Sequence, residues 1–295
     1  MIAKLVSTIK FISVNLIFIL LFITPTFILP VSKTLLERIN PKEMELFFPL
    51  LFLFVLYISY TFWLLIKNTN QNKFMVFVKL ATATFLLFPL MGFIESVFWL
   101  DSLNVVDDKE YVKIFLRSFI TFILFSAYLS LLYKKNNTLD QRGNNLLSLK
   151  LLTQKLLLIG VIYIFIYNLF GYFVAWQFES TRIYYTGTSE LKGFFTMLLH
   201  NFSDPKFVIV HILRGILFGL SGYILYTMLN CSKLKVTIII ALIFGGLGFQ
   251  IILPNPIFPE MVRISHFLET TTSMIVFGMI VVYIFDYGKN KTSKS

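Results

Sequence analysis

Histidine, arginine and glutamate recur at three-residue spacing on two apolar segments of the chain. One segment carries His211 and Arg214, and the other carries Arg263, His266 and Glu269. Three residues turn an α-helix by about 300°, so neighbouring members share a helix face, while the series from Arg263 to Glu269 drifts by about 120°. Arginine binds carboxylate or phosphate through its forked guanidinium, and a His–Glu pair can exchange protons. These residue types predict a site for an anionic or zwitterionic ligand.

Further ionisable residues lie inside apolar segments, where a charge is costly and is therefore a candidate for function. They are Lys79, Glu95 and Arg117. With the orientation derived below, His211, Glu95 and Glu269 would lie roughly 6, 8 and 14 Å below the outer membrane edge. All the buried charges except Lys79 therefore gather in the outer part of the membrane.

We predict that these residues form one outward-facing polar cavity. The predicted ligand-binding residues are His211, Arg214, Arg263, His266 and Glu269, with Glu95 nearby. Simpler interpretations exist for some of them. Arg117 and Arg263 lie close enough to helix ends to extend to the lipid headgroups, and His211 could be a packing residue. Glu269 is too short to reach water from its depth and needs a partner.

The elements that hold these residues follow from composition. The 295 residues are 57% hydrophobic and 14% charged, with a mean hydropathy of +0.79. A soluble domain usually carries about 25% charge, so the composition excludes a soluble enzyme and a disordered chain. The single cysteine, Cys231, excludes an internal disulfide and a thiolate-rich metal site. We predict an all-α, polytopic membrane bundle forming a single transmembrane domain over residues 1–295.

A bilayer core needs roughly 20 apolar residues per helix. Eight segments qualify: Phe11–Val31, Phe47–Ile66, Phe74–Leu100, Ile114–Tyr133, Leu156–Trp176, Phe207–Leu229, Val236–Leu253 and Met261–Phe285. Pro89 predicts a kink in the third span. The polar loop 134–155 divides the spans four and four, which allows a parallel repeat, although the two halves show no convincing residue-level similarity. The amphipathic stretch 190–202 predicts a helix at the outer membrane surface.

The loops predict the orientation. With the N-terminus inside, the inner segments carry fourteen Lys and Arg and the outer segments carry nine. Because basic residues collect in cytoplasmic loops, both termini are expected to be cytoplasmic. The net charge of +11 is thereby explained by topology, and nucleic acid is not expected as a partner. Frequent Ile, Asn, Lys and Phe indicate an AT-rich bacterial genome, hence a multi-pass protein of a bacterial inner or plasma membrane.

Three functions remain open for the polar residues. The first is binding or transport of a small or lipid-derived anionic or zwitterionic ligand. The second is a membrane-embedded enzyme that acts on a lipid or lipid-linked substrate, with His and Glu as acid–base groups or metal ligands. The third is a non-catalytic sensor or complex subunit, in which the charges form a structural network. The sequence leaves any cofactor and any protein partner unknown and assigns no metal ligands; the expected partner is the lipid bilayer.

Overall fold

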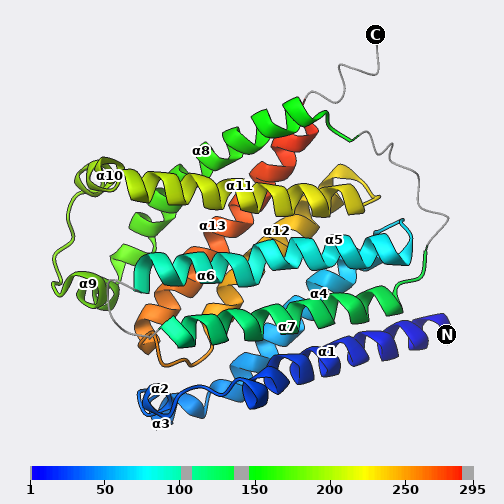
Figure 1. The fold of residues 1–295 in the computed structure, drawn as a ribbon, viewed down its shortest axis with the longest axis horizontal. Helices are drawn as coiled ribbons and strands as arrows, with labels where there is room; N and C mark the ends of the chain where they lie inside the picture. Colours follow the sequence, from blue (N-terminus) through cyan, green and yellow to red (C-terminus); the bar gives the residue numbers. More distant parts are fainter. Residues whose placement is uncertain (1, 101–107, 136–145, 288–295) are drawn as a thin grey trace.

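Long apolar helices run side by side through the computed structural model, which describes residues 2–100, 108–135 and 146–287 (Figure 1). Eight helices in these ranges are long and apolar enough to cross a membrane. The expected all-α polytopic bundle is confirmed. The spanning helices are α1 (Ile2–Ile28), α4 (Phe47–Lys67), α5 with its continuation (Lys73–Leu100), α7 (Asp108–Leu132), α8 (Leu149–Phe173), α11 (Pro205–Met228), α12 (Lys233–Ile251) and α13 (Glu260–Asp286).

Short helices connect the spans at one end of the bundle. They are α2 (Lys33–Leu36), α3 (Pro41–Met44), the 3₁₀ turn η4 (Ala175–Gln177), α9 (Glu179–Thr186) and α10 (Phe194–Ser203). We call this the α9–α10 end (Figure 1). Helix α10 covers most of the amphipathic stretch 190–202, and Phe195 and Leu199 on it are 73% and 71% exposed.

The third span is interrupted where the kink is predicted. Helix α5 (Lys73–Phe85) passes into the π turn η1 (Leu86–Leu90), which contains Pro89, and then into α6 (Met91–Glu95) and a second π turn, η2 (Ser96–Leu100). Proline has no amide hydrogen and its ring crowds the preceding turn, so the ladder of hydrogen bonds is displaced there. This irregular stretch carries Glu95.

The order of elements occurs twice along the chain. The first half runs α1, two short helices, α4, α5 and α7, and the second runs α8, two short helices, α11, α12 and α13. Within the halves, α1 packs on α4 and α7 as α8 packs on α11 and α13. Between the halves, α4 packs on α12 and α5 packs on α11. The bundle is therefore a parallel repeat of four spanning helices at the level of topology.

The linker between α4 and α5 and the linker between α11 and α12 meet at the end of the bundle opposite to α9 and α10. Thr69 and Leu229 form an antiparallel bridge, and the Asn230 amide donates to the Asn68 carbonyl at 2.8 Å. One cluster of buried apolar side chains includes members of all eight spanning helices. The halves thus share one core.

Helices α8 and α11 approach each other closely at two glycines. A Cβ added to Gly215 would lie 2.5 Å from the Tyr163 Cβ and 2.8 Å from the Gly160 Cα. Only a residue without a side chain fits this crossing, which is the role expected of small residues between membrane helices. The contact sets the position of Arg214, the residue before Gly215.

Candidate functional site

A cavity of about 590 Å³ lies between the two halves, towards the α9–α10 end. Spans of both halves contribute to its wall, together with α2, α9 and the linker before α13. Most of the wall is aromatic or aliphatic. The charged and imidazole side chains in it are Glu95, Glu110, Arg117, Arg214, His266 and Glu269.

Arg214 is the most buried charge in this wall apart from Glu110. Its side chain is 4% exposed, and its Nη2 lies 2.8 Å from Glu95 Oε2, whereas the Glu95 side chain is 49% exposed. The Nε and Nη1 atoms of Arg214 have no hydrogen-bond partner in the described part of the chain. A buried donor without a partner costs about 1–3 kcal/mol. Arg214 lines the cavity, but these two donors are themselves shielded from solvent, so an anionic group would reach them after a shift of the neighbouring side chains.

Aromatic rings surround the Arg214 guanidinium. Its Cζ lies 5.7, 6.0 and 5.9 Å from the ring centroids of Tyr163, Tyr167 and Phe218. Rings at this distance attract a cation through their electron-rich faces. They hold the side chain in place without using its donors, so the guanidinium is both fixed and partly uncommitted.

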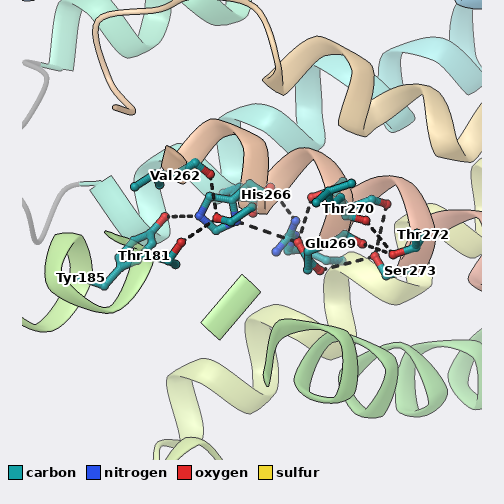
Figure 2. Close-up of polar contacts among 12 residues, drawn as sticks. Thr181, Tyr185, Val262, His266, Glu269, Thr270, Thr272 and Ser273 are labelled. Carbon is teal, nitrogen blue, oxygen red and sulfur yellow. Dashed lines mark hydrogen bonds and ion pairs between the residues drawn. The ribbon is translucent and has the colours of Figure 1, made fainter. Parts of the chain in front are cut away.

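A second polar group runs from α9 to α13, as Figure 2 shows. The Tyr185 hydroxyl and His266 Nε2 are 3.0 Å apart, and His266 Nδ1 lies 4.0 Å from Glu269 Oε2. Glu269 also accepts hydrogen bonds from the hydroxyls of Thr270 at 2.9 Å and Ser273 at 3.4 Å. The hydroxyls after Glu269 therefore satisfy its carboxylate. The contacts from Tyr185 through His266 to Glu269 link the short helix α9 to α13 along the cavity wall.

Hydrogen bonds hold helix α9, which carries Tyr185, against α13 and the linker before it. The buried hydroxyls of Thr181 and Ser265 lie 2.6 Å apart, and the Tyr184 hydroxyl donates to the Ile257 carbonyl at 3.0 Å. Burial raises the pKa of Tyr185 well above its ordinary value, and the charges of Glu95 and Glu269 raise it further. Tyr185 therefore keeps its hydroxyl proton at neutral pH. The sequence did not identify Tyr185 as a site residue, because the residues around a tyrosine between two spans give no information about which side chain it contacts.

His211 does not contribute to the cavity wall, although it lies one turn from Arg214. Its side chain is fully buried, its Nδ1 lies 2.8 Å from the Phe207 carbonyl oxygen, and its ring stacks on Phe207 with a centroid distance of 4.0 Å. The Tyr167 ring lies at 4.2 Å. The three-residue step leaves about 60° between the two side chains, and this angle directs His211 into the packing between α8 and α11.

Arg263 also lies outside the described cavity wall. Its Nη1 is 2.5 Å from Glu43 Oε2 on α3 and donates to the Phe258 carbonyl at 3.0 Å. The residue is 3% exposed. Arg263 thus joins α3 to α13. The drift of about 120° along the helix separates it from Glu269, as the periodicity of an α-helix requires.

The first turns of α7 bring two more charges to the wall. Arg117 Nη2 lies 3.9 Å from Glu110 Oε2, and Lys113 Nζ lies 2.5 Å from Glu110 Oε1. The Glu110 side chain is 2% exposed. Sequence reasoning assigned Glu110 to a loop because hydropathy detects only the apolar part of a helix. Helix α7 begins at Asp108, earlier than the predicted Ile114.

Metal-ligand geometry is not found in the described ranges, where no group of three or more His, Cys, Asp or Glu side chains could hold a metal ion. Comparison of the chain with models of protein families, with curated proteins and with solved structures finds no match. The functional argument therefore depends on the geometry of the cavity.

Proposed function

We propose that this multi-pass membrane protein binds, and moves across the membrane, a small or lipid-derived ligand that carries an anionic or zwitterionic group. The single observation that carries the proposal is Arg214, a buried guanidinium with two uncommitted donors in the wall of a cavity of about 590 Å³. That volume is in the range of about 300–1,000 Å³ typical of small-molecule sites.

The chemistry of the wall supports a ligand with two kinds of surface. The guanidinium of Arg214 suits a carboxylate or phosphate. The carboxylates of Glu95 and Glu269 provide partners for an ammonium group, which a zwitterion would supply. The aromatic and aliphatic remainder of the wall suits a hydrocarbon portion. A purely polar solute would leave most of this wall without favourable contacts.

The topology supports transport over simple storage. Substrate sites of transporters commonly lie at the interface between structural repeats, and one repeat moves against the other. The cavity lies between the two halves, and π turns flank the stretch that carries Glu95, so this part of the wall is irregular. In the orientation predicted from the loop charges, the cavity would face outside. The residue usage favours a bacterial plasma membrane as the location of the protein.

An acid–base enzyme is the second candidate, and the Tyr185–His266–Glu269 series favours it. Glu269 would orient His266, and His266 would exchange a proton with a lipid or lipid-linked substrate while Arg214 stabilised developing negative charge. A structural role is favoured for Arg263 and Glu43, whose ion pair joins α3 to α13 and does not itself line the cavity.

Thermal stability in detergent tests the binding proposal with three probes of matched chain length: oleate, oleoyl lysophosphatidylcholine and oleyl trimethylammonium. A ligand that binds the folded state raises its stability. We expect the anion and the zwitterion to raise the melting temperature of the wild type, the cation to leave it unchanged, and Arg214→Gln to abolish the effect. Arg38→Gln, on an exposed residue at the same end, is the matched control. Equal stabilisation by all three probes would refute the proposal.

A further inference from the structure

A second hollow, of about 410 Å³, lies at the end of the bundle opposite to α9 and α10, where α1, α5 and α7 meet. Four lysines line it: Lys10, Lys73, Lys134 and Lys135. Its lining in the described ranges includes no aspartate or glutamate, and none of the four lysines forms an ion pair with a described residue. This hollow is separate from the cavity that contains Arg214.

The frame of this hollow is held by hydrogen bonds. Tyr133 is 2% exposed; its hydroxyl donates to the Gln71 carbonyl at 2.9 Å and accepts from the Gln71 amide at 3.0 Å. Asn72 caps α5 by accepting from the Met75 amide at 2.8 Å. The start of a helix favours an anion, and here Lys73 occupies its first position. Lys73 is therefore presented by a capped helix start.

In the second half of the chain, the lysine that corresponds to Lys73 has an acidic partner. Lys233 begins α12 as Lys73 begins α5, and it lies 2.8 Å from the Asp286 carboxylate at the end of α13. The Tyr226 hydroxyl donates to the same carboxylate at 3.1 Å. At the corresponding end of α7, the first half carries Lys134 and Lys135. Asp286 therefore neutralises Lys233 in the second half, whereas the corresponding Lys73 of the first half lies beside three other lysines.

We propose that this hollow binds the phosphate of an anionic phospholipid headgroup. Four ammonium groups around one hollow repel one another unless an anion joins them, and basic hollows between spanning helices are suited to such headgroups. The topology rule explains why lysines collect at this end, but it does not require lysines of three helices to converge on one hollow. Leu131, which also lines the hollow and is 71% exposed, provides an apolar surface for an acyl chain.

Native mass spectrometry of the detergent-solubilised full chain tests this site. Dioleoyl phosphatidylglycerol and dioleoyl phosphatidylcholine are added in parallel titrations, and inorganic phosphate is added as a competitor. The test variant is Lys73→Gln with Lys134→Gln. The matched control is Lys150→Gln with Lys235→Gln, which removes the same charge from helix starts at the same end of the bundle. Thermal melting of each variant without lipid checks folding.

We expect the wild type to bind phosphatidylglycerol in preference to phosphatidylcholine. Each lysine is worth roughly fivefold in affinity for an anionic headgroup, so the test variant should lose about 25-fold and the control less than about threefold. Retention of phosphatidylglycerol at millimolar inorganic phosphate supports the lipid as the source of the phosphate, and displacement supports a free-phosphate site with the same lysines. An equal loss in both variants, or equal binding of both lipids, would overturn the proposal.

Discussion

The pair formed by Arg214 and Glu95 is asymmetric, and this asymmetry allows stability and ligand binding to be separated. The Arg214 side chain is 4% exposed and the Glu95 side chain is 49% exposed. Removing the carboxylate leaves a buried cation without its counter-charge. Removing the cation leaves a carboxylate that water in the cavity can reach. The two single substitutions therefore differ in cost although they break the same contact.

The magnitudes follow from the burial of each partner. Removing one partner of a fully buried pair costs about 3–5 kcal/mol. In Glu95→Gln the amide oxygen would still accept one hydrogen bond from Arg214, so we expect this variant to lower the free energy of unfolding by about 2–3 kcal/mol. Arg214→Gln should cost about 1 kcal/mol, because the exposed partner is screened by solvent. The two effects should couple by at least about 0.5 kcal/mol in the double variant, since the residues are in contact.

Binding should change in the opposite order. Glu95→Gln removes the carboxylate that repels an anion beside Arg214, so the affinity for oleate should rise. Arg214→Gln should abolish oleate binding. Thermal melting with and without oleate measures both properties in one assay. If Arg214→Gln proved the less stable single variant, or if Glu95→Gln lost oleate binding, the assignment of Arg214 as the anion-binding group would be wrong.

Three further predictions concern the frame around the site. Gly215→Ala should destabilise the protein by about 1–3 kcal/mol by overpacking, because its Cβ would meet Gly160 at 2.8 Å, whereas Gly171→Ala, with nothing within 4 Å, should be neutral or stabilising in the same melting assay. Lys155→Met should lower the free energy of unfolding by about 1–3 kcal/mol, because Lys155 donates to the Ile284 and Tyr287 carbonyls at the end of α13. Lys150→Met, at an exposed position, is the control. Equal melting temperatures of the two variants would contradict this role of Lys155. Burial raises the pKa of Tyr185, so its contribution to stability is fully present below the ordinary tyrosine pKa of about 10 and is lost as pH rises above it. Tyr185→Phe should therefore flatten the fall of melting temperature above pH 10, unlike Tyr283→Phe at a position that is 60% exposed. An unchanged slope would count against the raised pKa of Tyr185.

The helices and the positions of the charges along them were predictable because both depend on local sequence. A run of apolar residues that is long enough to cross a bilayer forms a helix whatever its neighbours are, and the position of Glu269 along α13 follows from counting residues. The π turn that contains Pro89 has an equally local cause. The ends of helices were less predictable: α7 starts at Asp108 because its charged first turns continue the helix beyond the apolar core.

The partners of the charges were not predictable in the same way. His211 and Arg263 have the same residue types and spacing as the members of the cavity wall, yet one packs against Phe207 and the other pairs with Glu43. Tyr185 and Glu110 join the wall from segments assigned to loops. Facing partners depend on the rotation of each helix about its axis and on contacts between residues far apart in sequence, such as Tyr185 with His266.

The sequence by itself determined the number of spans and the level along the helices at which the polar residues gather, because hydropathy and helical rise are properties of single segments. Only the tertiary structure decided which of these residues share a cavity. Close approach at Gly215, the π turns beside Glu95 and the attachment of α9 to α13 orient the side chains. The close approach and the attachment are contacts between segments, which no single helix contains.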